Sequence, residues 1–409
     1  MGCPTDCTGG AHGHQPARGR CRDCGAGPAG LMLAHRLSRQ GISTIAVDTR
    51  TRHEIETTHR AGILESGSVD MLVRGGVSDR ILRDGYEHHG VELRYGGHGH
   101  RIDFTEHVGS SVWLYPQTDV FIDLADARER DGGDVRFGVT DTEVLDPYTE
   151  RPAIRFIDDA GEEWTVRAKI VVGADGSRSM CRNLIPAETV TRYFHEYPFA
   201  WFGILCEAPM SAPELIYAHS DRGFALISQR TDSVQRMYFQ CDPNENPDDW
   251  SEDRIWSELQ ARVAGDGFAL TTGPVFEKVV LKFRSFVQEP MRHGRLVLAG
   301  DAAHTVPPTG AKGLNLALSD VRILSDVLAR FLESGDERIL ATYEPTALRR
   351  VWRSQNFSYW MTQMLHLAPG GDPFAVKRQL GELETVTGTR QGQAYLANAY
   401  TGWPREEGL

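Results

Sequence analysis

The sequence predicts an α/β fold in which a Rossmann-like nucleotide-binding domain is interrupted by an inserted β-rich domain and followed by a helical C-terminal region. Three observations predict this fold. Glycine-containing turns stand beside apolar, strand-like stretches at three separate places, which is typical of a dinucleotide-binding domain split along the chain. Short alternating stretches fill much of residues 191–290. Helical apolar spacing dominates from residue 313 onward.

Composition narrows the class of protein. The chain has 409 residues, of which 40% are hydrophobic, and a formal net charge of −12. This composition is ordinary for a globular protein, and its acidic balance argues against general nucleic-acid binding. No apolar run reaches the roughly 18–20 residues of a membrane span, and the first 30 residues lack the apolar stretch of a signal peptide. We therefore expect a soluble, cytoplasmic protein.

The first turn has the spacing of a dinucleotide-binding motif. Gly25 would allow a tight turn, Gly27 would let the backbone approach a pyrophosphate, and Gly30 would allow close packing of helix on strand. Helical spacing follows in residues 31–40, and then an apolar strand that ends at Asp48. An acid at this place can accept a hydrogen bond from a ribose hydroxyl. Alone the motif is weak, but the helix and the acid-tipped strand strengthen it.

The stretch before these glycines departs from the pattern. A central parallel strand is normally buried on both faces, whereas residues 18–24 read Arg-Gly-Arg-Cys-Arg-Asp-Cys. We therefore expect residues 1–24 to be irregular, or a misassigned start of the chain. A zinc cluster or a redox pair is the alternative. Its candidate ligands are Cys3, Cys7, Cys21, Cys24, His12 and His14. No predicted fold surrounds these residues, so we expect no metal.

Two later turns extend the nucleotide-binding prediction. A buried-strand pattern at residues 168–172 is followed by Asp175, and another at residues 295–299 is followed by Asp301. Either carboxylate could accept a hydrogen bond from a ribitol or ribose hydroxyl. The loop 307–313 then offers backbone N–H groups at the start of a long helix, an arrangement that suits a diphosphate or an electron-rich isoalloxazine edge. Three such turns in this order indicate FAD.

Ser228 and Arg230 form a candidate carboxylate clamp. They stand two residues apart on a predicted strand, so we expect both side chains on the same face. A guanidinium can bind a carboxylate through two hydrogen bonds, and the hydroxyl can add a third. An arginine on a strand is, taken alone, more often a surface residue.

Beyond these motifs, the chain resembles the aromatic-ring hydroxylases of the flavoprotein monooxygenase class. The resemblance runs from residue 25 to about residue 404 and is carried by residues 60–65, 214–218, 222–230, 300–315 and 398–404. It implies FAD bound by the three-turn domain, substrate under the β-rich domain, and a homodimer. The predicted division is 25–190 for the first part of the FAD-binding domain, 191–290 for the substrate domain, and 291–409 for FAD-binding completion and a helical interface region.

The resemblance also implies roles at the aromatic substrate. Tyr238 closes the carboxylate pocket. Tyr217 faces the substrate phenol, Tyr400 bonds to Tyr217, and His88 stands at the outer end of this proton relay, while the Pro308 carbonyl lies near the same phenol. A phenolate is a better carbon nucleophile than a phenol, and a histidine with a pKa near 6.5 can pass its proton to solvent. A buried tyrosine or histidine is, taken singly, more often an ordinary core residue.

Cofactor contacts follow from the same resemblance. Those to FAD are Arg60 and Gln117 on the pyrophosphate side and Gly310, Lys312, Leu314 and Asn315 along the flavin. Those to the nicotinamide co-substrate are Arg50, Glu54, Arg178 and Arg284. Arg50 could attract the 2′-phosphate of NADPH, whereas Glu54 would repel that phosphate and could accept from the ribose hydroxyl of NADH. We expect NADH to be used at least as well as NADPH.

The implied activity is hydroxylation of 4-hydroxybenzoate at position 3, with NAD(P)H and O₂ as co-substrates. Two alternatives stay open. One is a flavin hydroxylase acting on an amino-substituted or otherwise substituted hydroxybenzoate, which the carboxylate clamp would not distinguish. The other is an inactive homologue, because residues 18–24 could disrupt the first strand.

Overall fold

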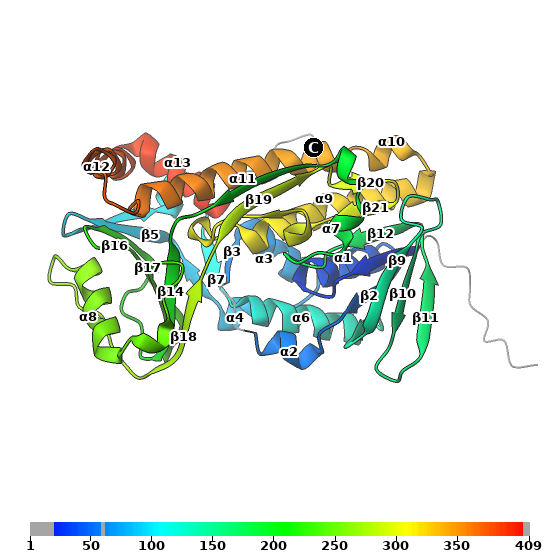
Figure 1. The fold of residues 1–409 in the computed structure, drawn as a ribbon, viewed down its shortest axis with the longest axis horizontal. Coiled ribbons are helices and arrows are strands. Elements are labelled where there is room, and N and C mark those ends of the chain that lie inside the picture. Colours follow the sequence, from blue (N-terminus) through cyan, green and yellow to red (C-terminus); the bar gives the residue numbers. More distant parts are fainter. Residues whose placement is uncertain (1–19, 59–61, 404–409) are drawn as a thin grey trace, which may run out of the picture.

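The computed structural model describes residues 20–58 and 62–403, and of residues 20–24 only the backbone (Figure 1). A six-stranded sheet forms the predicted Rossmann-like core in the order β20-β21-β12-β1-β2-β8. Its strands are β1 (Arg20–Cys24), β2 (Ser43–Asp48), β8 (Asp134–Phe137), β12 (Ile170–Gly173), β20 (Arg292–His293) and β21 (Leu296–Leu298). All pair in parallel except β20, as expected for a dinucleotide-binding sheet.

The expectation that the chain is irregular up to residue 24 is wrong for residues 20–24. β1 lies at the centre of the sheet, where Cys21 pairs with Thr44 of β2 and with Ile170 of β12. Strand pairing uses backbone N–H and C=O groups, which a polar sequence supplies as well as an apolar one. Residues 1–19, with Cys3, Cys7, His12 and His14, lie outside the described residues.

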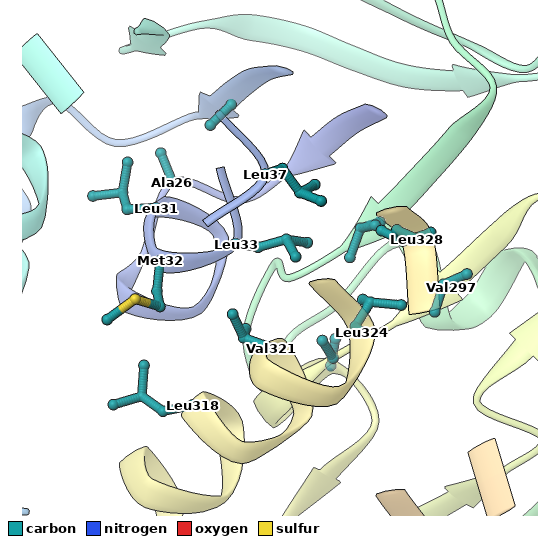
Figure 2. Close-up of a cluster of buried hydrophobic side chains, with 14 of the residues drawn as sticks. Ala26, Leu31, Met32, Leu33, Leu37, Val297, Leu318, Val321, Leu324 and Leu328 are labelled. Atoms are coloured by element: carbon teal, nitrogen blue, oxygen red, sulfur yellow. The ribbon is translucent and has the colours of Figure 1, made fainter. Parts of the chain in front are cut away.

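Two helices pack together on this sheet and bury a leucine-rich core. Helix α1 (Pro28–Ser38) and helix α9 (Gly313–Ser334) match the predicted helices closely. Figure 2 shows Leu33 and Leu37 of α1 facing Leu324 and Leu328 of α9, and all four side chains are fully buried. Burying one such side chain stabilises the fold by about 1.5–3 kcal/mol. This core fixes the N-termini of both helices relative to the strand ends.

The second large sheet has seven strands in the order β18-β14-β17-β16-β15-β5-β6. They are β5 (Gly90–Tyr95), β6 (His98–Asp103), β14 (Ala200–Glu207), β15 (Ile216–Ser220), β16 (Gly223–Thr231), β17 (Val234–Cys241) and β18 (Val275–Leu281). β5 pairs in parallel with β15, so Glu92 stands beside Ile216. The sheet therefore extends beyond the predicted 191–290 segment and takes two strands from residues 90–103. Helix α8 (Glu252–Val263) packs its apolar face on one side of it.

Smaller elements connect the two large sheets. The remaining strands are β3 (Ile63–Glu65), β4 (Tyr86–His88), β7 (Val112–Leu114), β9 (Thr140–Leu145), β10 (Ala153–Ile157), β11 (Glu163–Arg167), β13 (Thr191–Glu196), β19 (Arg284–Glu289) and β22 (His304–Thr305). Further helical segments are α2 (Arg52–Glu56), α3 (Ser66–Val73), α4 (Ile81–Asp84), α5 (Phe104–Val108), α6 (Gln117–Arg130), α7 (Cys181–Leu184), α10 (Glu337–Leu340), and the 3₁₀ turns η1 (Ala187–Thr189), η2 (Pro247–Asp249), η3 (Gly300–Ala302) and η4 (Pro308–Gly310).

Helix α11 (Tyr343–Leu365) spans the junction of the two halves, and α12 (Pro373–Gly388) and α13 (Arg390–Thr401) follow it (Figure 1). The first half of α11 packs on β19 and α9 through Val351. The second half of α11 joins the core of the seven-stranded sheet through Phe357 and Met361. None of the helices in residues 20–58 and 62–403 has the length and apolar character needed to cross a bilayer.

Candidate active site

Two of the three glycines of the first turn are required by close backbone contacts, and the third stands beside open space. Gly25 has a φ of +119°, and a Cβ there would lie 2.3 Å from the carbonyl oxygen of Ala174. A Cβ on Gly30 would lie 1.9 Å from the carbonyl oxygen of Gly25, whereas no described atom lies within 4 Å of one on Gly27. Gly27 is the N-cap residue of α1, and no described side chain caps this end of the helix. Its first N–H groups can therefore bind an anion.

Two of the three predicted acidic residues, Asp48 and Asp175, hold their own turns. Asp48 accepts a hydrogen bond from the amide of Ala26 at 3.2 Å and pairs with the guanidinium of Arg50 at 3.1 Å. Asp175 accepts from the Ser179 hydroxyl at 2.6 Å and also from the amides that begin α7. Asp301 lies in η3, directly after β21. A carboxylate has about four lone-pair sites, and Asp48 uses them on the Ala26 amide and on the amide and guanidinium of Arg50, so a ribose hydroxyl would have to replace one of the Arg50 bonds.

Of the two predicted pyrophosphate contacts, Arg60 lies outside the described residues. Gln117 begins α6 and is half-buried. A Cβ on Gly62 would lie 2.8 Å from the Gln117 amide nitrogen, so the chain just after residue 61 lies against the start of α6. The structure thus brings this segment to Gln117.

The segment predicted to line the flavin begins at η4 and continues into α9. The ammonium of Lys312 lies 2.7 Å from Glu65 Oε1 and donates to the Tyr400 carbonyl at 2.8 Å. Burial lowers the pKa of Lys312, and the Glu65 carboxylate opposes that shift. The side-chain amide of Asn315 bonds to the Ile63 carbonyl at 2.7 Å, while Leu314 is half-buried. These bonds fix α9 against β3 and α13, and Glu65 is a partner that the sequence did not single out.

The two tyrosines of the predicted relay meet directly. The hydroxyl oxygens of Tyr217 on β15 and Tyr400 on α13 lie 2.7 Å apart, and both residues are buried. Burial raises the pKa of both phenols. The Pro308 carbonyl accepts from the Ala311 amide at 2.9 Å, which leaves it one lone pair.

His88, the predicted outer member of the relay, lies at the end of β4 and is 2% exposed. Neither of its ring nitrogens bonds to another described residue, so it does not touch either tyrosine through a direct hydrogen bond. Burial lowers the pKa of His88, and the nearby Glu214 carboxylate opposes this shift. His88 is therefore a buried, neutral imidazole with free bonding capacity.

The structure alters the predicted carboxylate clamp. Gln229 pairs with Gln235 and Thr231 with Val234, so Arg230 is the extra residue of a β-bulge and simple alternation between Ser228 and Arg230 is interrupted. The Ser228 hydroxyl donates to the backbone carbonyl of Arg236 at 2.7 Å, so its single proton is already used.

A second arginine joins this pocket, and sequence reasoning missed it. Arg236 stands opposite Ser228 across the β16–β17 pair, is buried, and lies 5.8 Å from the centre of the Tyr238 ring. Burial and the charge of Arg236 lower the pKa of Arg230, against the opposing charges of Asp119 and Glu277. Two neighbouring guanidinium groups shielded from water favour an anion between them. The sequence did offer a signal for Arg236. The predicted strands 224–230 and 234–241 can form a hairpin, in which Ser228 stands opposite Arg236.

The predicted nicotinamide contacts lie apart. Arg50 is paired with Asp48, and Glu54 accepts from the Thr51 amide at 2.7 Å in a capping box at the start of α2. Arg178 is exposed in the turn after β12, and Arg284 is exposed at the start of β19. Hydrogen bonds from Thr51 lower the pKa of Glu54, and the nearby charge of Arg50 lowers it further. No hydrogen bond or ion pair, however, joins two of the four predicted residues within the described part of the chain.

Comparison with known proteins identifies relatives over most of the chain. A family described as FAD binding domain matches residues 24–358. The p-hydroxybenzoate hydroxylase of Acinetobacter baylyi is 40% identical over 384 residues, which cover 93% of this chain and 95% of that protein. The crystal structure of p-nitrophenol 4-monooxygenase from Pseudomonas putida superposes with a TM-score of 0.80 at 18% identity, covering 95% of this chain and 99% of that one. A complex of aklavinone-11 hydroxylase with FAD and aklavinone gives a TM-score of 0.68 at 22% identity, covering 86% and 70%.

Proposed function

Because the chain belongs to the FAD-binding family of aromatic-ring hydroxylases, we propose that it is a flavin monooxygenase that hydroxylates 4-hydroxybenzoate at position 3. In the balanced reaction, 4-hydroxybenzoate, O₂, NAD(P)H and a proton give 3,4-dihydroxybenzoate, NAD(P)⁺ and water. The single observation that supports the substrate is a buried aromatic cluster that holds the hydrogen-bonded phenols of Tyr217 and Tyr400 together with Tyr238, beside which two arginines lie. Phenols and guanidinium groups around one cluster suit a flat ring that carries a hydroxyl and a carboxylate.

The residues present fit FAD. The open side of Gly27 at the uncapped start of α1 suits a pyrophosphate, and Asp48 at the end of β2 would accept from the adenosine ribose by exchanging one of its bonds to Arg50. We assign further contacts to Gly25, Gly30, Gln117, Asp175, Asp301, Gly310, Lys312, Leu314 and Asn315. FAD, when bound, takes electrons from the nicotinamide co-substrate and delivers one oxygen atom of O₂ to the aromatic ring. The protein binds and orients the ring and excludes water.

At the phenol end, the chain's task is to remove a proton from a dry site. The raised pKa of Tyr217 and Tyr400 keeps both protonated, so they pass a proton along rather than hold a negative charge. The substrate phenol would donate to Tyr217, Tyr217 to Tyr400, and the proton would reach His88 through water. The lone pair left on the Pro308 carbonyl would face the same phenol.

At the carboxylate end, Arg230 and Arg236 would bind the substrate anion, with Tyr238 closing the pocket beside them. Because the Ser228 proton is committed to a backbone carbonyl, Ser228 would contribute by fixing Arg236 unless that bond breaks. The carboxylate would restore to both arginines the favourable interaction that burial removes.

A panel of benzoates tests the substrate. We expect purified holoprotein to be yellow and to form 3,4-dihydroxybenzoate from 4-hydroxybenzoate with one NAD(P)H consumed per product. Faster and better-coupled product formation from an amino-substituted hydroxybenzoate would instead establish the first alternative. The inactive-homologue alternative has lost its basis, since β1 is formed and pairs on both sides.

We also infer a homodimer, as the resemblance implies, and a location in the cytoplasm, as the composition predicts. Tyr193, Phe194 and Trp352 leave an exposed aromatic face between β13 and α11. Light scattering should give twice the chain mass of 45.5 kDa. Phe194→Asp should yield a monomer, and Phe374→Asp, a change at a more exposed phenylalanine on α12, should not.

A further inference from the structure

Helix α11 carries a buried row of polar side chains that the proposed reaction does not use. Ser358 and Thr362 stand four residues apart on one face of the helix, and His366 follows at its C-terminal cap. All three are buried. Buried polar groups destabilise a fold unless they form hydrogen bonds, so the partners of Thr362 and His366 indicate what these side chains do. The Ser358 hydroxyl has no hydrogen-bond partner among the described residues.

One set of partners is the η4 loop. The hydroxyl oxygens of Thr362 and Thr309 lie 2.9 Å apart. A Cβ on Gly310 would lie 2.7 Å from Ser358 Oγ, so α11 lies directly against the loop. Ala311, the next residue, has a φ of +52°, a left-handed conformation that a non-glycine residue keeps only where its surroundings enforce it. The row on α11 is part of those surroundings.

The other partner is Trp201, which lies beside the proposed substrate site. The indole N–H of Trp201 on β14 donates to His366 Nε2 at 2.7 Å, and His366 Nδ1 bonds to the Thr362 carbonyl at 2.9 Å. The first bond requires Nε2 to be the acceptor, so the proton lies on Nδ1. Burial lowers the pKa of His366 to about 3, which keeps the ring neutral. Trp201 in turn packs on Tyr238 with ring centres 5.0 Å apart.

We propose that Thr362 and His366 are positioning residues that hold the η4 loop and Trp201 in fixed positions relative to each other. The contacts run from Trp201 through the His366 ring to the backbone carbonyl of Thr362, and the hydroxyl of the same residue bonds to Thr309, so the substrate side and the flavin side of the site share one support. A displacement of about 1 Å between reacting groups can cost a factor of 10² in rate, which is why such a support affects chemistry. The inference rests on the proposed function for its substrate, but its geometry requires only bound FAD.

Thr362→Val tests the proposal, because it removes the hydroxyl at nearly constant volume. The first readout is the visible circular dichroism of bound FAD without substrate, which we expect to change in Thr362→Val and to be restored in Thr362→Ser. The matched control is Thr387→Val, which removes a buried helix hydroxyl bonded to Tyr95 on another face of the protein. An unchanged spectrum in Thr362→Val would overturn the proposal whatever the substrate is.

The second readout is the yield of 3,4-dihydroxybenzoate per NAD(P)H. We expect at least a threefold loss in Thr362→Val, with a KM for 4-hydroxybenzoate within threefold of wild type. Thr309→Val should give the same loss, and the double variant should be no worse than either single one, because both remove one contact. Additive losses would contradict the direct Thr309–Thr362 link. Failure of the wild-type protein to hydroxylate 4-hydroxybenzoate would refute the proposed function alone, since the spectrum still decides the positioning role.

Discussion

The hydroxyl groups of Tyr217 and Tyr400 form a hydrogen bond with their oxygens 2.7 Å apart, and both side chains are buried from water. The two residues come from β15 and α13, which lie far apart in the chain. Because burial raises the pKa of both phenols, each stays protonated and can relay a proton without storing charge.

Tyr217→Phe should separate oxygen consumption from hydroxylation. The substrate phenol would lose its proton acceptor, so NAD(P)H oxidation would continue while product yield fell by at least tenfold and hydrogen peroxide appeared. Chromatography of the product and a peroxide assay measure both quantities. Tyr95→Phe, which removes a hydroxyl bonded to Thr387 away from the site, is the control. Well-coupled hydroxylation in Tyr217→Phe would refute the relay.

Arg230→Ala should weaken 4-hydroxybenzoate binding strongly. Removing one partner of a shielded ion pair typically costs about 3–5 kcal/mol, which corresponds to a loss of more than a hundredfold in affinity. The change of flavin absorbance on substrate addition measures the dissociation constant. We expect Arg236→Ala to weaken binding as well, and Arg230→Lys to recover part of the loss. A change below tenfold in Arg230→Ala would show that Arg230 does not bind the carboxylate.

The product yield should begin to decrease with falling pH only below pH 6.5; this decrease is the acid limb of the pH profile. The relay needs a neutral imidazole, and burial moves the pKa of His88 down from its ordinary value. As pH falls, His88 therefore stays neutral, and hydroxylation stays efficient, to a lower pH than with an exposed histidine. His88→Asn should lower the yield at all pH values and remove this limb. An unchanged profile in that variant would place the proton exit elsewhere.

Stability should decrease as pH falls below 6.5. The buried histidines His35, His219 and His366 have lowered pKa values, so the unfolded chain binds their protons first. Each such histidine contributes about 1.4 kcal/mol per pH unit between 6.5 and its pKa in the fold. Because the pKa of His366 is about 3, His366→Gln should reduce the slope of unfolding free energy near pH 5 by about this amount. Urea titrations at several pH values measure it, and equal slopes would contradict a neutral His366.

NADH should support turnover at least as well as NADPH. Arg50 is paired with Asp48, which reduces the attraction it can offer a 2′-phosphate, and the exposed Glu54 carboxylate repels one. Steady-state rates with saturating 4-hydroxybenzoate compare the two co-substrates. We expect Glu54→Gln to improve NADPH more than NADH. A tenfold preference of the wild-type protein for NADPH would show that the basic residues dominate.

Local patterns in the sequence predicted the elements whose contacts are local. The Gly25–Gly30 turn and α9 were predicted because their spacing depends on near neighbours. The pairing of β5 with β15 was not, since two strands far apart in the chain leave no shared local pattern. β1 was misjudged because side-chain polarity was weighed above backbone pairing.

Some residues of the candidate site were also predicted from the sequence, and others were not. Resemblance placed Tyr217 and Tyr400 in one relay, and the structure brings them together. Arg236 was missed because its place opposite Ser228 depends on the register of a hairpin, and the bulge at Arg230 depends on the same register. The partners of Lys312 come from β3 and α13, so only the folded chain brings them together.

The parallel pairing of β5 with β15 has a consequence for how the chain acquires its fold. β5 leaves the ribosome long before β15 exists, so its edge waits unpaired while the intervening segment is made. Such non-local pairing slows folding and exposes a strand edge to aggregation. Excising residues 191–290 would leave that edge permanently open. The two halves are therefore expected to fold as one cooperative unit, with a single unfolding transition.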